Sequence, residues 1–270
     1  MHLNNNGYKM FVYDGHGHST ASDGLHEPEK IIDVAVAKGL QIVGLSDHNL
    51  VSKLPRFLDY ADKINSHSMK ILPIPGIEIS TTKGHMLVSL PIRKKAEEFI
   101  AHYKKPNKRP QPLDLIEEYI EQYDAIIVFV HPDIVLHGLK TDYIEQLLTK
   151  IPKHLHKNIG IEVYNWMAQA LFWSRSKEEN EIHSRNHIFN LAPFSFTDYH
   201  SAYHVGNGST AVYMKSLTEE EFLKAIQERR TSPLNTSNRG MTEYVEIVKA
   251  TLAAEAMSRL SRRDFHIAKK

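Results

Sequence analysis

The sequence contains no cysteine in its 270 residues. That absence excludes disulfide bonds, zinc sites built from cysteine, and thiol nucleophiles, and it is consistent with a reducing compartment. The first residues, Met1 to Asn6, lack the basic and apolar regions of a signal peptide. No apolar run approaches the roughly 20 residues that a membrane span requires. We therefore expect a soluble, cytoplasmic protein without a membrane partner.

The chain also lacks an excess of charge of either sign. Lysine and arginine total 33, aspartate and glutamate total 32, and the formal net charge is +1. Proteins that bind long nucleic acids usually carry a basic surface, so we expect no long nucleic acid as partner. A mononucleotide or a short oligonucleotide is compatible with this charge. The sequence also has no glycine-rich phosphate loop and no nucleophile elbow, so it offers neither of these familiar catalytic devices.

Histidine, in contrast, is abundant, with 17 residues. Two of them, His16 and His18, follow an apolar run that is typical of a strand. Alternate residues of a strand point to the same face, so the two imidazoles can reach one point. Asp23 follows in a Ser-Asp-Gly turn, and His48 follows a second apolar run. Imidazoles and carboxylates together suit first-row transition metals, which makes a metal enzyme the first hypothesis.

Strand and helix patterns alternate along the chain. Strands are expected at 10–14, 41–45, 70–80, 85–90, 125–130, 160–164, 191–196 and 210–214, and helices at 28–38, 52–67, 142–150, 167–183, 218–229 and 242–265. This alternation predicts a parallel sheet with helices outside, in one α/β domain over residues 8–270. Pro73 and Pro75 are expected to interrupt their strand, and the charged segment 96–122 resembles an inserted helical segment.

Polar residues recur just past the expected strand ends. They are His16, His48, Glu78, His131, Glu162 and Asp198. In α/β barrels the reacting groups lie at the carboxyl ends of the strands, so one pocket can collect residues that are far apart in sequence.

Five segments, taken in order, resemble the motifs of the PHP family, named for polymerase and histidinol phosphatase. These are Asp14–Gly24, Leu45–His48, Pro75–Ser80 with His85, Val130–Pro132, and Thr197–His200 followed by Val205 and Gly206. The resemblance runs from about Tyr13 to about Arg230, and the order of five motifs makes it specific. Two positions depart from the family pattern: Gly15 stands where a larger apolar residue is usual, and Ser46 where threonine is usual.

The resemblance implies a distorted (β/α)7 barrel with a site for two or three divalent metal ions. The sequence patterns add a small helical insertion and a long C-terminal helix to this fold. It implies three ligand sets: His16, His18, Glu78 and Asp198; Glu78, His85 and His131; Asp23, His48 and His200. Glu78 would bridge the first two sets. Zinc, manganese and iron all accept such ligands, so the sequence does not identify the metal.

The activity implied is hydrolysis of a phosphate ester by a hydroxide that bridges two metal ions. Metals acidify a bound water and offset the charge of the phosphoryl group. Glu78 and Asp198 would hold the reacting centre, and His200 or a metal-bound water would protonate the leaving group. The expected substrate is a small phosphomonoester, a nucleotide or a short oligonucleotide. Two alternatives stay open: amidohydrolase-like hydrolysis at a carbon centre, and a metal-stabilised binding module without catalysis.

Several other polar and charged residues stand outside the implied ligand sets. Glu162 and Asn165 match no metal position, so we expect them to support the site or the fold. Asp47 is expected to orient a neighbouring ligand, with helix capping as the alternative. Arg93 and Lys94 can bind a substrate phosphate, or they belong to a solvated run of charge. The sequence gives no oligomeric state.

Overall fold

The computed structural model describes residues 7–67, 70–134, 137–171 and 189–235. Its strands are β1 (Lys9–Asp14), β2 (Ile42–Leu45), β3 (Leu72–Ser80), β4 (His85–Ser89), β5 (Ile126–Phe129), β6 (Ile159–Asn165), β7 (Ala192–Phe196), β8 (Gly208–Met214) and β9 (Thr231–Asn235). Its α-helices are α1 (Pro28–Ala37), α2 (Leu54–Ser66), α3 (Arg93–His102), α4 (Pro112–Tyr123), α5 (Thr141–Lys150), α6 (Trp166–Leu171) and α8 (Glu219–Gln227). Short 3-10 helices are η1 (Lys153–Asn158) and η3 (Ala202–His204).

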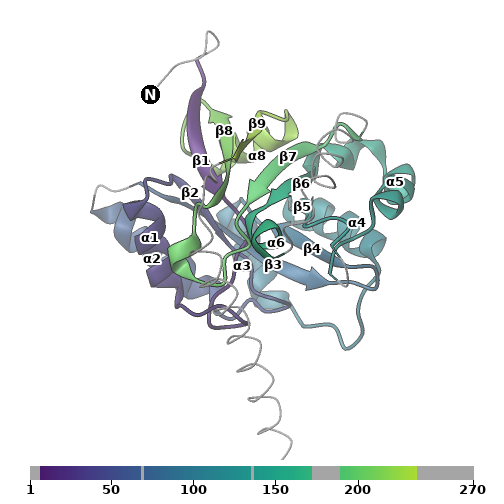
Figure 1. Ribbon diagram of the computed structural model, residues 1–270, viewed down its shortest axis with the longest axis horizontal. Coiled ribbons are helices and arrows are strands. Elements are labelled where there is room, and N and C mark those ends of the chain that lie inside the picture. The colour runs from purple at the N-terminus through teal and green to yellow at the C-terminus, as the bar shows by residue number, and fades with distance from the viewer. Residues whose placement is uncertain (1–6, 68–69, 135–136, 172–188, 236–270) are drawn as a thin grey trace, which may run out of the picture.

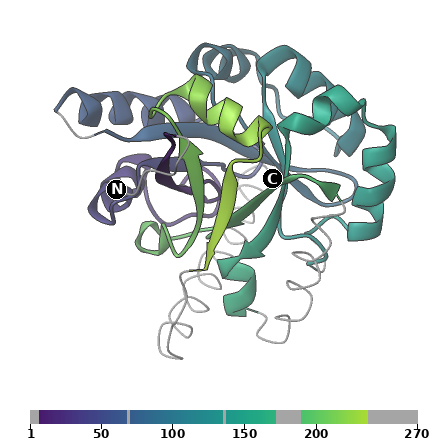
Figure 2. The same cartoon turned by 90° about the horizontal axis from the view of Figure 1, so that it is seen from above.

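The strands form one sheet in the order β7-β6-β5-β4-β3-β2-β1-β8-β9. Its two ends approach each other, because the Ser195 amide of β7 donates to Thr210 Oγ1 of β8 over 2.9 Å, and that hydroxyl donates back to the Ser195 carbonyl. The sheet is therefore a nearly closed barrel with helices outside (Figures 1 and 2). The predicted α/β barrel is confirmed.

The strand directions differ from a uniform parallel barrel. Parallel pairing joins β1, β2 and β3, and again β5, β6 and β7. However, β4 runs antiparallel to both β3 and β5, and β8 runs antiparallel to β1 and β9. The described sheet thus has nine strands, one more than the eight that the sequence patterns predict, and the added strand is β9. A tight turn through Gly84, which has a φ of +145°, folds β4 back onto β3, so His85 pairs with Ser80.

The prediction that prolines interrupt β3 was wrong, because the strand is continuous through Pro73 and Pro75. Both prolines pair with β2, and the Pro75 carbonyl accepts a hydrogen bond from the Leu90 amide on the other side. The ladder between β3 and β4 begins only at Gly76, so the missing N–H groups of the prolines face a side where no strand pairs.

The charged segment 96–122 is largely helical, in α3 and α4. These two helices connect β4 to β5 and bury Phe99, Leu115 and Ile116 in the same apolar cluster as the strands. The segment is therefore part of the helical layer of the barrel.

Other helices agree with the sequence patterns to different extents. Thr218 caps α8 as expected, since its hydroxyl oxygen accepts from the Glu221 amide at 3.3 Å. The predicted helix 167–183 is described only to Leu171, and the predicted helix 242–265 lies outside the described residues. Within the described ranges, none of the helices has both the length and the hydropathy to cross a membrane.

Candidate metal centre

The nine predicted ligands come together at one end of the barrel. His16 and His18 directly follow β1, His48 follows β2, and Glu78 lies near the end of β3. His85 opens β4, and the antiparallel register places it beside the end of β3. His131 follows β5, and Asp198 and His200 follow β7. Asp23 comes from the loop between β1 and α1. The structure thus brings all nine residues together at strand ends and in the loops beside them.

Glu78 lies at the centre of this cluster and is 1% exposed. Its Oε1 is 2.9 Å from His85 Nδ1 and 3.0 Å from His131 Nε2. The other oxygen, Oε2, is 2.9 Å from His48 Nδ1, and it lies 3.4 Å from the Nε2 atoms of both His16 and His18. Each carboxylate oxygen therefore faces a different group of imidazoles, which is the arrangement required of a carboxylate that bridges two cations.

Among the described residues, four overlapping groups of side chains offer atoms close enough together to hold one ion each. They are His18, Asp23, His48 and His200; His16, His18 and Glu78; His16, His131 and Asp198; His48, Glu78 and His85. All nine expected ligands occur in at least one of these groups, but in combinations that differ from the expected sets. His18 also joins the group around Asp23, where the resemblance implied no contribution from it.

The chemistry of the donors fits divalent ions. Several buried polar atoms of the cluster have no hydrogen-bond partner among the described residues: His16 Nε2, His18 Nδ1, Asp23 Oδ1, Glu78 Oε2 and His131 Nδ1. Buried polar atoms without partners are costly, so proteins rarely retain them without a reason. His16 Nε2 faces Glu78 Oε2 at 3.4 Å, and His18 Nδ1 faces Asp23 Oδ1 at 3.8 Å, so a cation in each of these two places would satisfy them.

The electrostatics of the cluster reflect this crowding. Burial opposes ionisation of Glu78, but the positive charges of His48, His85 and His16 outweigh it and hold its pKa well below the ordinary value. Burial likewise opposes protonation of His16, yet Asp198 and Glu78 raise its pKa well above the ordinary value. His48 behaves in the same way beside Glu78 and Asp23. The raised imidazole pKa values favour protonated His16 and His48 beside these carboxylates in the metal-free protein, and metal binding would displace those protons.

These shifted pKa values predict how the stability of the metal-free protein depends on pH. The raised pKa values of His16 and His48 contribute stability that is complete below about 6.5 and is lost as pH rises through the folded-state values. The lowered pKa of Glu78 contributes stability that is present above about 4.5 and is lost as pH falls through its folded-state value. We expect the Tm of the metal-free protein to be highest between these limits.

Differential scanning fluorimetry measures the Tm of the metal-free and metal-saturated protein between these pH limits and on both sides of them. The alkaline fall in Tm is expected to be smaller in the metal-saturated protein, because a cation replaces the protons. Parallel Tm profiles of the two forms would count against displacement of protons by metal.

Asp47, which was expected to orient a neighbouring ligand, makes its hydrogen bonds to a loop instead. It is 1% exposed and contacts the loop before Asp23 rather than an imidazole. Its Oδ1 accepts from the Ser19 amide at 2.8 Å and from Ser22 Oγ at 2.7 Å, and its Oδ2 accepts from Ser19 Oγ at 2.7 Å. Asp47 therefore fixes the loop that carries Asp23, and only indirectly the ligand itself.

Asp14 is a supporting residue that the sequence did not single out. Its Oδ1 accepts from the Thr197 amide at 3.0 Å and its Oδ2 from the Gly206 amide at 2.8 Å, so it ties β1 to the loop that carries Asp198. Burial raises its pKa to about 7, although the hydrogen bonds from Thr197 and Gly206 oppose this shift. Asp198 itself has a φ of +58°, a left-handed conformation that such ties help to maintain.

Gly15 departs from the family pattern for a visible steric reason. A Cβ at this position would lie 2.2 Å from the Tyr13 hydroxyl oxygen and 2.9 Å from the Phe196 ring. Tyr13 packs edge-on against Phe196, with ring centroids 5.1 Å apart. In this chain the tyrosine fills the space that a larger residue after Asp14 would need. Ser46, the second departure, still exchanges hydrogen bonds of 3.1 Å with the Gly17 amide and carbonyl.

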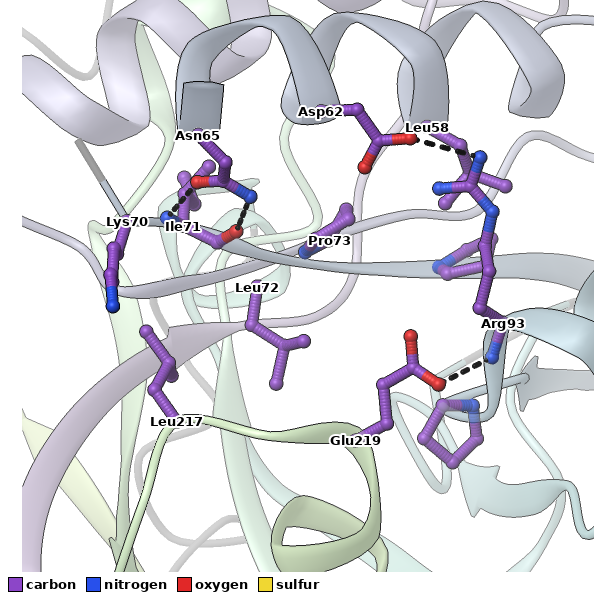
Figure 3. Close-up of a pocket in the computed structure, with 12 residues that line it drawn as sticks. Leu58, Asp62, Asn65, Lys70, Ile71, Leu72, Pro73, Arg93, Leu217 and Glu219 are labelled. Atoms are coloured by element: carbon purple, nitrogen blue, oxygen red, sulfur yellow. Dashed lines mark hydrogen bonds and ion pairs between the residues drawn. The ribbon is translucent and has the colours of Figure 1, made fainter. Parts of the chain in front are cut away.

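Arg93 and Lys94 do not join the cluster. β4 runs from His85 at the cluster to Ser89 beside Gly76, so the residues after it lie toward the opposite end of the barrel. Arg93 lines a separate cavity of about 270 Å³, where its guanidinium is 3.2 Å from Asp62 and its amide donates to Glu219 (Figure 3). We therefore leave both residues out of the proposed site.

Comparison with known proteins identifies relatives of this chain. The model of the PHP domain matches residues 14–171. The 5'-3' exoribonuclease Rnm of Salmonella typhimurium is 36% identical over 70 residues. That match covers 26% of this chain and 23% of the relative, so the chain spans about a quarter of the curated relative it matches.

Solved structures extend the similarity of fold over most of the chain. A two-domain protein of Bacteroides vulgatus, described as containing a predicted PHP-like metal-dependent phosphoesterase, aligns with a TM-score of 0.60 at 20% identity. The alignment covers 87% of this chain and 67% of that one. The lesion-specific endonuclease EndoQ of Pyrococcus furiosus aligns with a TM-score of 0.57 at 19% identity, over 82% of this chain and 56% of that one. The shared fold is that of the barrel described above.

Proposed function

The chain belongs to the PHP domain family, and from this membership we propose that it is a metal-dependent hydrolase of phosphate esters. The observation that carries the proposal is the position of Glu78, a buried carboxylate whose two oxygens face five histidines. The unpartnered atoms of His16, His18 and Glu78 support it, because a cation would satisfy them. Two or three divalent ions, of zinc, manganese or iron, suit this donor set.

Ions held here would supply a water that ionises near neutral pH and positive charge that offsets the charge of the phosphoryl group. In the hydrolysis, a water oxygen forms the new bond to phosphorus and the ester P–O bond breaks. The leaving oxygen then requires a proton. We propose that Glu78 would be a ligand shared by two of these ions. Asp198 would be a further ligand, because its Oδ1 is 3.6 Å from His16 Nε2 and 3.2 Å from His18 Nε2.

We further propose His200 as the source of that proton when the group around Asp23 holds no ion. Its Nε2 is 3.3 Å from Asp23 Oδ2, and its Nδ1 is 3.1 Å from the Asp198 carbonyl oxygen. Burial opposes protonation, but Asp23 and Asp198 raise the pKa of His200 above its ordinary value. The His200 side chain is 14% exposed, so it is in contact with solvent. With an ion bound there, the same imidazole serves as a ligand.

The proposed substrate is a nucleotide or a short oligonucleotide. Rnm is named as an exoribonuclease, and EndoQ as a lesion-specific endonuclease. These two names support a phosphate ester of a nucleic acid as the substrate. The net charge of +1 favours short substrates, because long strands are held mainly by basic surfaces.

A substrate panel tests the proposal. Full-length protein saturated with Mn²⁺ or Zn²⁺ is expected to release phosphate or nucleotides from at least one of four classes: phosphomonoesters, nucleoside bisphosphates, oligoribonucleotides of two to ten nucleotides, and longer strands. Chelation should abolish the release, and the Asp198→Asn variant should reduce it strongly. If the loaded protein left every class intact, or turned a class over no faster than Asp198→Asn, the proposal would fail.

One observation favours a second candidate, hydrolysis at a carbon centre. In the described part of the chain, the ion pairs of the cluster join histidines to carboxylates, without lysine or arginine. A phosphate site often includes such cations, whereas an amide site does not need them. Amides and lactones therefore belong in the same panel, and their metal-dependent hydrolysis in the absence of phosphoesterase activity would favour this candidate.

A further inference from the structure

Glu162 is a buried carboxylate that lies against the cluster but belongs to none of its ion-holding groups. It is on β6 and its side chain is fully buried. Its two oxygens have different partners. Oε1 is 3.4 Å from His16 Nδ1, while Oε2 accepts from the His131 amide at 2.5 Å and from Asn165 Nδ2 at 3.0 Å. One side chain thus contacts two of the proposed ligand residues.

The imidazole of His16 lies between Glu162 and the centre of the cluster. Its Nδ1 faces Glu162, whereas its Nε2 is 3.4 Å from Glu78 Oε2 and 3.6 Å from Asp198 Oδ1. A hydrogen atom on Nδ1 that is donated to Glu162 leaves the Nε2 lone pair directed at the cluster. A carboxylate behind a histidine ligand commonly fixes the tautomer and the ring orientation in this way.

Asn165 extends the contact to a third ligand. Its Nδ2 donates to Glu162 Oε2 at 3.0 Å and to Asp198 Oδ2 at 3.3 Å. Its Oδ1 accepts from the Ala168 amide in the first turn of α6, which sets the orientation of the amide group. Because Asn165 faces Oδ2, the other oxygen of Asp198 remains directed at His16 and His18.

We propose that Glu162 and Asn165 are positioning residues that hold His16, His131 and Asp198 in their metal-binding orientation. This inference rests on the proposed function, since it assumes that the cluster binds metal. Glu162 accepts from His16 Nδ1, the His131 amide and Asn165 Nδ2. Glutamine in its place has only one acceptor oxygen, so at least one of these donors would face an NH₂ group and lose its acceptor. Asn165 carries both a donor and an acceptor that are in use, so alanine in its place releases Asp198.

The test compares Glu162→Gln with a control variant, Asn158→Ala, at the end of η1 directly before β6. Asn158 is 1% exposed, donates to the Ala125 carbonyl and accepts from Gln227 Nε2, each at 3.0 Å. Its loss removes buried hydrogen bonds without touching the cluster. Zn²⁺ affinity of each full-length protein is measured by competition with a chromophoric chelator, and visible absorption of the Co²⁺-loaded proteins reports the ligand geometry.

Glu162→Gln is expected to weaken binding of at least one ion by about 10–100-fold and to change the Co²⁺ spectrum. Asn158→Ala is expected to keep affinity and spectrum while its Tm falls. If Glu162→Gln does not fold, Asn165→Ala is expected to weaken affinity in the same direction. Affinity within about threefold of wild type in the folded variant, or equal losses in Asn158→Ala, would overturn the inference. A wild-type protein that binds no ion would instead refute the proposed function.

Discussion

Replacing Glu78 with glutamine is expected to lower the turnover of a phosphate ester by about 10³-fold or more. Both oxygens of the carboxylate face imidazoles, and an amide offers one oxygen, one N–H donor group and no negative charge. Loss of the bridge therefore removes charge that offsets repulsion between neighbouring cations. Metal ions contribute several kcal/mol to the stabilisation of such a transition state, and about 4 kcal/mol corresponds to about 10³-fold in rate.

The comparison needs a control with the same chemical change at a distance from the site. Glu98→Gln serves, because Glu98 is exposed on α3, away from the cluster. Initial rates of both variants are measured at saturating metal with the best substrate of the panel. Glu98→Gln is expected to retain wild-type rates. A Glu78→Gln variant that kept more than about a tenth of the wild-type rate would show that Glu78 does not bridge the reacting ions.

Replacing Asp47 with alanine is expected to cost about 3–5 kcal/mol of folding stability. The carboxylate accepts three hydrogen bonds from Ser19 and Ser22, and its removal leaves the buried Ser19 amide and hydroxyl without an acceptor. A buried donor that loses a charged acceptor costs about 1–3 kcal/mol or more. The loop that carries Asp23 is released as well, so this variant is also expected to bind less metal in the group around Asp23.

Urea denaturation of the metal-free proteins measures the change in the free energy of unfolding. Asp47→Asn retains one acceptor oxygen and is expected to lose less stability than Asp47→Ala. Asp59→Ala removes a carboxylate that is 79% exposed and is expected to stay within about 0.5 kcal/mol of wild type. A loss below about 1 kcal/mol for Asp47→Ala would contradict the role assigned to its hydrogen bonds.

The positions of the proposed ligands could be predicted because they follow local rules. His16 and His18 share a face through the two-residue period of an extended segment, and His48, His131 and Asp198 each follow an apolar strand. Asp23 stands in a Ser-Asp-Gly turn that the sequence itself shows, and the family resemblance added His85 and His200. The three ligand sets that it implied differ from the four groups that the side chains form, because these groups depend on distances between loops from different strands.

The position of Arg93 depends on the direction of one strand, β4. The sequence places Arg93 soon after a strand, as it does His131, and a parallel strand would have put both at the same end of the barrel. Because β4 is antiparallel, its first residue, His85, lies in the cluster and the residues after its end do not. Nothing in the short apolar run of β4 distinguishes the two directions.

The supporting carboxylates depend on long-range contacts that no local pattern encodes. Asp47 and Ser19 are brought together by the pairing of β1 with β2. Glu162 meets His16 across 146 positions of the chain. Sequence reasoning could mark Glu162 as a polar residue near a strand end, but its partners follow only from closure of the sheet.

The most direct test of the central claim is the metal content of the full-length protein. The protein is equilibrated with Mn²⁺, Zn²⁺ or Fe²⁺, freed of unbound ion, and analysed by inductively coupled plasma mass spectrometry. The account predicts two or three ions per chain with at least one of these metals, and fewer in Glu78→Gln. Less than about one ion per chain with all three metals, or the same content in both proteins, would contradict it.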